Sequence, residues 1–422
     1  MSYGFAVTDA IIDAPAPPTA LRRVTQAFGE PSYRWWFASQ LVSASGAMTQ
    51  GVAQSWLVLQ HTGRPDSLGL LTACTWLPVL LGGPWAGALV DRHDRRRILL
   101  ATQAVLLLAS LAQATISATG FALLPATFAL AVITGAVSAV DAPARQVYVL
   151  ELVGAARLTS AVSLFEVMLN ASRVIGPATA GVLLVSLGPT ACFLVNAATF
   201  AAPLLVVLRS HPRFRSAAQE KTPAGVLDGL RYAWRTPVIL ACVGIGVAGG
   251  MLFNLAATLP PLATQTFHQG PGGYGAMMAA YGLGAIPGAV IAASRAAGPT
   301  ARQARALASL SGLAVLLTAV SPWAIGGYLA LALTGFLSIW LAAVANTLIQ
   351  LRARPDMRGR TMALWNISVT GALPLTGPLT GLVAQHAGAR AGFGLSGAAL
   401  VFTALLAWRA LGTDERTSTM AG

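Results

Sequence analysis

Charged residues are scarce in this chain of 422 residues: they make up 10% of it, while hydrophobic residues make up 55%. Average soluble domains contain roughly 25% charged residues. The composition therefore excludes an ordinary water-soluble globular protein, because one core cannot bury so much apolar surface. The 43 glycines and 24 prolines are typical of membrane helices, whose neighbours satisfy the freed backbone groups.

Cysteine is almost absent too. Cys74, Cys192 and Cys242 lie in separate apolar segments without paired spacing, which argues against a disulfide framework and against a zinc site. We expect no bound metal. The first 23 residues carry acids and prolines early and lack a basic segment followed by an apolar one, so we expect no cleaved signal peptide.

Catalytic and nucleotide-binding motifs are missing as well. The chain has no HExxH, GxSxG or GxxxxGK arrangement, and its five histidines fall in or near expected loops. These absences argue against an intramembrane enzyme and against ATP as an energy source. We expect no cofactor and take a proton gradient as the energy source.

The basic residues give a net charge of +13, which in a soluble protein would suggest nucleic-acid binding. Here the arginines form short clusters between apolar runs rather than one basic face, so we expect no nucleic-acid partner. Such clusters encode topology in membrane proteins.

Twelve runs are long enough to cross a bilayer, which needs about 20 residues. We expect an all-α membrane protein with helices at 35–60, 66–90, 98–119, 121–145, 158–187, 189–208, 237–264, 271–295, 303–320, 324–350, 361–385 and 388–410. All but three of the 27 Lys and Arg residues then lie on one face; the exceptions are Arg64, Arg173 and Arg390. This asymmetry predicts a bacterial inner-membrane protein with both termini in the cytoplasm.

The longest polar interval, 209–236, divides the chain into two halves of six helices. We expect a tail at 1–34, a half at 35–208, a cytoplasmic loop at 209–236, a half at 237–410 and a tail at 411–422. Within the loop, Leu227, Leu230 and Trp234 recur at helical spacing among charged residues, which predicts an amphipathic helix on the membrane surface.

A shift of 201 residues aligns the two halves. It superposes Gly83 and Gly87 on Gly284 and Gly288, Arg157 on Arg358, and Gly176-Pro177 on Gly377-Pro378. Parallel six-helix repeats are the architecture of one large class of transporters.

The motif after the second expected helix, GALVDRHDRRR at 87–97, resembles the signature loop of the major facilitator superfamily, with Asp94 in place of the usual glycine. In that family the acid and the arginine of the loop hold the cytoplasmic side shut, and the arginine pairs with an acid on helix four. The resemblance implies a conformational lock formed by Asp91, Arg95 and Asp141. The alternative is a solvated positive cluster.

Further segments, among them DAPARQVYVLEL at 141–152 and NASRVIGPATAG at 170–181, resemble the branch that contains the enterobactin exporter and certain macrolide efflux pumps. This resemblance covers nearly all of 33–410. It implies export by proton antiport of a siderophore or a drug-like compound.

The fifth expected helix carries Glu166, Asn170, Arg173 and Pro177 on one stripe. Charges at membrane depth are costly, so the stripe should face a water-accessible cavity or a polar partner. Glu166 is a candidate proton-coupling site with Arg173 as a second cavity charge, or else a structural anchor. Asn170 is a candidate cargo contact.

Two further groups of residues are candidates for function. Gly176, Pro177 and Gly181 resemble the glycine-proline motif of antiporters, and Gly377 with Pro378 repeats it, so these residues are expected either to form a gate or to pack helices closely. Gln40, Ser43, Gln50 and Gln54 share a stripe on the first helix. They should line the substrate cavity or hydrogen-bond between helices.

The expected function is proton-coupled export of a small organic molecule by alternating access. The partners would be a small-molecule substrate, protons and membrane lipid, and the protein is expected to be a monomer. An importer on the same fold is the main alternative. A cargo-free scaffold or sensor is a further one, although it would gain nothing from burying Glu166 and Arg173.

Overall fold

The computed structural model describes residues 25–210, 226–294, 298–355 and 357–408, and over these ranges it consists of helices and short connections without a strand. The helices of the first half are α2 (Pro31–Thr62), α3 (Pro65–Arg92), α4 (Arg95–Thr119), α5 (Leu123–Val153), α6 (Leu158–Ser186) and α7 (Pro189–Arg209), with short 3-10 turns at Gln26–Gly29 and Ala155–Arg157. Then follow α8 (Val226–Arg235), α9 (Pro237–Phe253), α10 (Leu255–Pro261), a π turn (Leu262–Thr266), α11 (Pro271–Ser294), α12 (Ala301–Val320), α13 (Ala324–Arg352), α14 (Arg358–Val369), α15 (Leu373–Ala387) and α16 (Ala389–Leu406). The expected tails at 1–34 and 411–422 lie outside the described residues, apart from 25–34.

Local sequence explains many of the helix ends. Proline occupies the first turn of α2, α3, α7 and α9, where its missing N–H is not needed and its fixed φ suits a helix. Gly63 and Gly120 end α2 and α4 with φ of 62° and 70°, a left-handed conformation that glycine adopts without steric cost. The short connections that result make sequential helices antiparallel.

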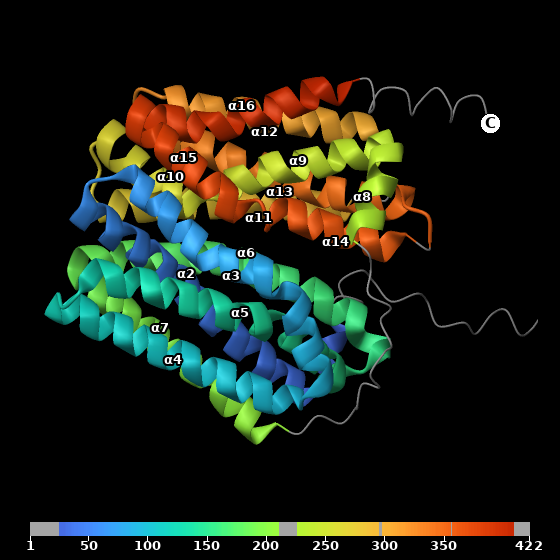
Figure 1. The fold of residues 1–422 in the computed structure, drawn as a ribbon, viewed down its shortest axis with the longest axis horizontal. Helices are drawn as coiled ribbons and strands as arrows, with labels where there is room; N and C mark the ends of the chain where they lie inside the picture. The colour runs from blue at the N-terminus through green and yellow to red at the C-terminus, as the bar shows by residue number, and fades with distance from the viewer. Residues whose placement is uncertain (1–24, 211–225, 295–297, 356, 409–422) are drawn as a thin grey trace, which may run out of the picture.

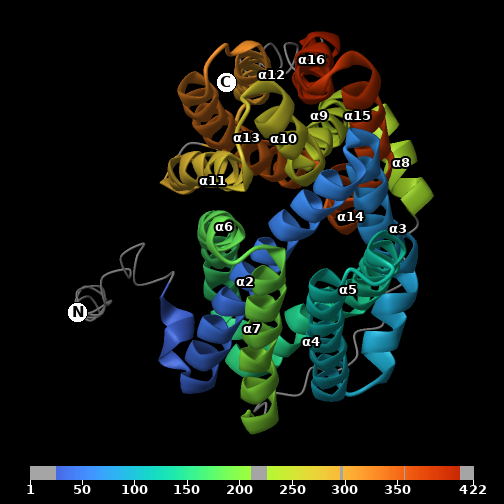
Figure 2. The same ribbon diagram turned by 90° about the vertical axis from the view of Figure 1, so that its left-hand side faces the viewer.

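Two groups of helices lie side by side (Figure 1), α2–α7 in blue to green and α9–α16 in yellow to red. One end of the bundle contains the start of α2, the α3–α4 and α5–α6 connections, α8 and the end of α16. We call it the arginine-rich end, and the other end, with the turns at Gly63, Gly120, Gly188 and Gly388, the arginine-poor end. Figure 2 shows that the two groups meet through α6 with α11 and through α3 with the α10 and α15 region.

The helices are those of a multi-pass membrane protein. Ten of the described helical segments are long and apolar enough to cross a bilayer, and the α8–α9 pair gives an eleventh. The 32-residue α2 is long enough as well, but its glutamines and serines lower its hydropathy. Counting α2, the fold agrees with the expected twelve helices in two six-helix groups.

Two crossings are broken rather than continuous. The helix expected at 237–264 divides at Asn254 into α9 and α10 and then widens into a π turn, in a stretch that contains Pro260 and Pro261. The helix expected at 361–385 divides at Thr370–Ala372 into α14 and α15. Breaks of this kind occur in membranes where protein surrounds the freed backbone groups.

The amphipathic helix expected in the central loop is α8. It turns by 115° from α9, and its Leu230 and Trp234 side chains are exposed while Ala233 is fully buried. The Tyr232 hydroxyl accepts a hydrogen bond from the Arg354 backbone N–H at 3.2 Å, which ties α8 to the C-terminal group. Residues 211–225 of the same loop lie outside the described residues.

The repeat seen in the sequence matches the helix boundaries. Shifting α6 by 201 residues gives 359–387, and α14 and α15 together run from Arg358 to Ala387. The α6 copy is one continuous helix, whereas the second copy is broken. The two halves are therefore related in sequence but differ in local conformation.

Candidate functional site

The signature loop is a tight connection between α3 and α4. Asp94 caps α4 by accepting a hydrogen bond from the Arg96 backbone N–H at 2.8 Å, and its φ is −64°. The turn thus needs no residue with positive φ, and aspartate replaces the usual glycine without strain. Arg96 donates to the Val207 and Leu208 carbonyls at 3.0 and 2.7 Å, which binds the loop to the end of α7, where free carbonyls attract a cation.

The two charges expected to form the lock have different environments. Asp91 is exposed and belongs to none of the ion pairs among the described residues. Arg95 is largely buried and lies 3.9 Å from Glu151 Oε1, in the last turn of α5. Asp141 is ten residues earlier on α5, about 15 Å deeper along the helix axis. Arg95 therefore pairs with Glu151 rather than with Asp141 in this structure.

Asp141 is fully buried and forms an ion pair with Arg145, one turn further along α5. Its carboxylate also accepts hydrogen bonds from Thr102 at 2.7 Å and Gln103 at 2.8 Å, both on α4. Arg145 in turn donates to Gln40 Oε1 on α2 at 2.9 Å. These contacts compensate the buried charges and join α2, α4 and α5, as a stable buried ion pair requires.

The polar stripe of α2 forms hydrogen bonds with other helices of the N-terminal group. Gln40 binds Arg145, and Gln50 Oε1 accepts hydrogen bonds from Ser110 and Asn196, both at 2.7 Å. Gln54 lies 3.5 Å from the Thr127 carbonyl oxygen, and Ser43 is buried. None of the four lines the large cavity described next. Of the alternatives for this stripe, the geometry favours hydrogen bonding between helices.

A cavity of about 920 Å³ lies between the two groups of helices. It reaches from Gly298 and Pro299, in the α11–α12 connection, to Arg173 and Thr370 further inside the bundle, so it opens at the arginine-rich end. Its volume is in the range of pockets that hold drug-sized molecules, roughly 300–1,000 Å³.

One wall of the cavity is the α6 stripe. Glu166, Asn170 and Arg173 all line it. Arg173 Nη1 donates to Asn170 Oδ1 at 3.1 Å, and the Asn170 amide donates to the Glu166 backbone carbonyl at 2.9 Å. Neither charged side chain belongs to an ion pair among the described residues, and of the described residues no other ionisable side chain lines the cavity.

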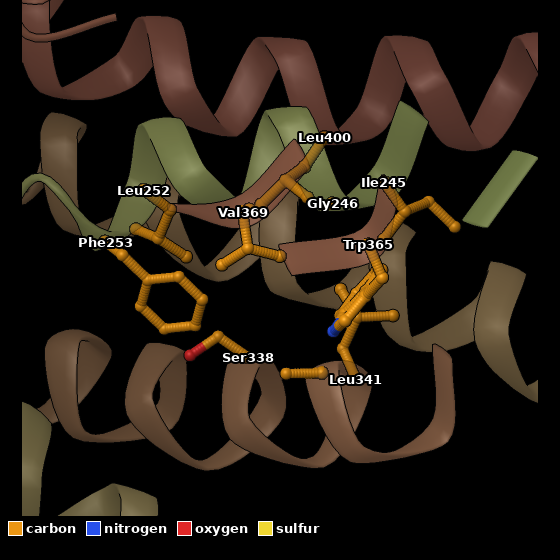
Figure 3. A pocket seen from close by; sticks show the side chains of 11 residues that line it. Ile245, Gly246, Leu252, Phe253, Ser338, Leu341, Trp365, Val369 and Leu400 are labelled. Atoms are coloured by element: carbon orange, nitrogen blue, oxygen red, sulfur yellow. The ribbon is translucent and has the colours of Figure 1, made fainter. Parts of the chain in front are cut away.

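The facing wall comes from the C-terminal group and combines aromatic rings with amides. Phe253, Trp340 and Trp365 supply the rings, and Asn346 and Asn366 supply the amides. Phe253, Val369 and Trp365 also border a smaller apolar pocket of about 20 Å³ that lies deeper among α9, α13, α14 and α16 (Figure 3). This wall suits the apolar body of an organic molecule.

Backbone contacts close the arginine-poor end. A Cβ built on Gly275 of α11 would lie 2.5 Å from the Gly181 Cα of α6, and one built on Gly69 of α3 would lie 2.5 Å from the Gly377 carbonyl oxygen. At these distances only glycine allows the helices to approach so closely. Pro378 lies beside Gly69 as well. The second glycine-proline motif therefore packs across the boundary between the two groups.

The first glycine-proline motif packs differently. Gly176 faces Ser45 and Met48 of α2, and the Thr49 hydroxyl donates to the Gly176 carbonyl at 3.0 Å. Pro177 removes the hydrogen bond that the Arg173 carbonyl would otherwise accept. A Cβ built on Gly282 of α11 would lie 2.6 Å from that oxygen. Pro177 thus lies where α6 meets the other group.

A buried amide also bridges the two groups. Asn254, at the break between α9 and α10, accepts a hydrogen bond from Thr72 of α3 at 3.1 Å and donates one to Thr380 of α15 at 3.2 Å. Its side chain is buried. The sequence reasoning missed this residue, although an asparagine inside an apolar run is the kind of signal that could have identified it.

Sequence reasoning also missed Arg145 and Glu151. The four-residue spacing of Asp141 and Arg145 on one helix was the available signal for the ion pair between them. The cavity aromatics had no signal of their own, because tryptophan and phenylalanine in an apolar helix serve equally well in lipid-facing and cavity-facing positions.

The chain matches the family described as transmembrane secretion effector over residues 25–417. It is 30% identical over 372 residues to the multidrug efflux pump Tap of Mycolicibacterium fortuitum, covering 85% of this chain and 90% of the pump. It is 29% identical over 412 residues to the enterobactin exporter EntS of Salmonella typhi, covering 92% and 94%. A bacterial homologue of the lysosomal transporter Spinster, solved in an inward-facing and unoccupied conformation, has the same fold, with a TM-score of 0.71, 14% identity and coverage of 91% and 98%.

Proposed function

Because this chain belongs to the transmembrane secretion effector family of major facilitator transporters, we propose that it exports a small organic molecule in exchange for protons by alternating access. The cargo would be a siderophore or a drug-like compound, as the names of the two relatives suggest for those proteins. The protein would act as a monomer in the bacterial inner membrane, in contact with its lipid.

The observation that carries this proposal is the cavity of about 920 Å³, open at one end of the bundle and closed at the other. Backbone contacts at Gly69, Gly181, Gly275 and Gly377 close the arginine-poor end. A cavity with access from a single side is one of the two states that alternating access requires.

The arginine-rich end is the cytoplasmic one in this proposal, because basic residues accumulate in cytoplasmic loops. The cavity then faces the cytoplasm, where an exporter collects its cargo. The start of α2 and the end of α16 lie at this end (Figure 1). The closed end at Gly275 and Gly377 would be the outward gate, and Pro177 and Pro378, each of which removes a backbone hydrogen bond, would let α6 and α15 bend and separate there.

Glu166 is the proposed proton-coupling residue and Arg173 its companion charge in the cavity. The Glu166 carboxylate lies on a membrane-spanning helix and lines the cavity, and ionisable side chains in such positions mark proton and substrate pathways. Asn170, which lies between them and binds Arg173, would contact the cargo.

The signature loop would act as the lock of the outward-facing state. In the state described here Asp91 is exposed and outside every ion pair of the described residues, as expected if its partners approach only when the arginine-rich end closes. Arg95 would be held in position by Glu151, and Asp141 would act through Arg145, which it anchors.

Neutralising the lock should favour the cavity-open state. We expect Asp91→Asn and Arg95→Gln to lower the transport rate more than the affinity for cargo, because a bias of about 1 kcal/mol changes a two-state ratio roughly fivefold. The kinetics of transport in proteoliposomes give both quantities. Arg97→Gln, an exposed charge in the same loop, is the matched control. Unchanged transport in both variants would show that Asp91 and Arg95 do not form a conformational lock.

The proposed function is tested by the accumulation of a panel of siderophores and fluorescent drugs in cells with and without the protein. We expect lower intracellular accumulation of at least one compound, and an uncoupler of the proton gradient should abolish the difference. Higher accumulation would show an importer. A difference that the uncoupler leaves unchanged would exclude proton coupling.

A further inference from the structure

The charges of the cavity have a fixed arrangement along α6. Glu166 and Arg173 are seven residues apart on one stripe, which corresponds to about 10 Å along a helix axis. Both line the cavity, and Arg173 makes one described side-chain hydrogen bond, to Asn170. At this separation the two cannot pair directly, so the cavity presents an anion and a cation at two levels of the same wall.

Both charges need partners when the cavity is emptied of water. Charged side chains inside a membrane protein are stabilised by water, by counter-ions or by opposite charges on a ligand. Among the residues that the structure describes, no other ionisable side chain lines the cavity, and the polar groups facing α6 are uncharged amides and hydroxyls such as Asn346, Asn366 and Thr370. When the cavity closes around its cargo, the cargo itself is the available source of counter-charges.

The facing wall indicates what lies between those charges. Phe253, Trp340 and Trp365 bring three aromatic rings to the side opposite Glu166 and Arg173. Flat apolar groups pack well against such rings. The wall therefore favours a rigid aromatic or apolar body over a flexible polar chain.

We propose that the cargo is a zwitterion: a flat apolar body that carries a cationic group for Glu166 and an acidic group for Arg173, about 10 Å apart. This assignment rests on the proposed export function and specifies its cargo class. It also explains why proton and cargo would move in opposite directions. A proton on Glu166 removes the anion that holds the cationic group, so proton and cargo compete for one site.

The test uses a set of small probes with one scaffold. The probe 4'-(aminomethyl)biphenyl-4-carboxylic acid has an ammonium and a carboxylate at the two ends of a flat aromatic body. Its methyl ester keeps only the cation, its N-acetyl derivative keeps only the anion, and 4-(aminomethyl)benzoic acid keeps both charges at a shorter separation. Binding of each to the purified full-length protein is measured by calorimetry without any proton gradient.

We expect the zwitterionic biphenyl to bind at least about tenfold more tightly than any of the other three, because each of those cannot make one of the two charge-assisted contacts. Glu166→Gln should reduce its affinity to that of the N-acetyl derivative, and Arg173→Gln to that of the ester. Arg97→Gln and Asp66→Asn, which neutralise charges outside the cavity, should leave all four affinities unchanged.

Equal affinity for the zwitterion and a singly charged probe overturns this assignment. A preference that survives both α6 substitutions also overturns it. So does the absence of zwitterion binding at about 1 mM, a concentration that corresponds to a binding free energy of only about 4 kcal/mol. The result is independent of transport. Uncoupler-sensitive efflux without zwitterion preference would leave the export function standing and refute the cargo class. Zwitterion binding that depends on Glu166 and Arg173, without uncoupler-sensitive transport, would support the cargo class and refute proton-coupled export.

Discussion

Glu166→Gln is expected to abolish efflux driven by a pH gradient, with a fall of at least about 100-fold in the gradient-dependent rate. Glutamine has the shape of glutamate but cannot take up a proton in this pH range. Because Glu166 is the one acidic side chain among the described residues that line the cavity, no neighbour in that wall can replace it. Exchange of cargo for cargo, which needs no net proton movement, should continue at cargo concentrations high enough to saturate the weakened site.

The measurement uses proteoliposomes with an imposed pH gradient, with saturating cargo taken from the compounds that the accumulation panel identifies. Asp66→Asn is the control, since it also neutralises a carboxylate but in the ion pair with Arg64 beyond the end of α2. Gradient-driven efflux with unchanged pH dependence in Glu166→Gln would move the proton site elsewhere. The buried Asp141 would then be the next residue to test.

Asp141→Asn is expected to destabilise the protein by about 3–5 kcal/mol, the usual effect of removing one partner from a buried ion pair. Asp141 is fully buried, and Arg145 with 27% of its side chain exposed would lose its counter-ion. Thr102 and Gln103 would keep polar contacts with an asparagine at this position, so the loss reports chiefly on the charge. Thermal unfolding of the purified protein measures the effect.

A double-mutant cycle separates the charge from the packing. Asp141→Asn combined with Arg145→Gln should recover part of the lost stability, because the second change removes the unpaired cation. Asp66→Asn breaks the exposed pair with Arg64 and should change stability by less than about 1 kcal/mol. Simple additivity in the cycle would mean that Asp141 and Arg145 do not stabilise one another.

The order of the helices could be read from the sequence because lipid imposes a minimum length of apolar residues on every crossing. The runs at 189–208 and 324–350 agree closely with α7 and α13. Where protein rather than lipid surrounds the chain, that constraint is relaxed. The breaks at Asn254 and at Thr370–Ala372 therefore occur inside runs that look continuous in the sequence.

The functional residues were predicted less completely, for a related reason. Glu166, Asn170 and Arg173 stood out because charge on an apolar helix implies a polar environment, and they do line the cavity. Gln40 and Gln50 carried the same kind of signal, yet they bind other helices of their own group. Spacing identifies an inward-facing stripe, whereas only the packing of neighbouring helices decides whether that side faces a cavity or a partner.

Which charges pair near the signature loop is determined by how far along its helix each residue lies. Asp141, Arg145 and Glu151 share α5, and Arg95 begins α4 at the level of Glu151. A pairing rule taken from a related family names the residue types that pair, but it does not say at which depth along the helix each of them lies. The assignment of Asp91, Arg95 and Asp141 to a lock therefore stays a prediction that the loop variants test.

The glycines at the arginine-poor end have a consequence for how this protein can change over generations. A Cβ on Gly275 would lie 2.5 Å from the Gly181 Cα, and one on Gly69 would lie 2.5 Å from the Gly377 carbonyl oxygen. Glycine is the smallest amino acid, so every missense change at Gly69 or Gly275 adds bulk against a backbone and holds this end apart. Variation that broadens the choice of cargo can accumulate on the aromatic wall around Trp365, while these two positions stay fixed.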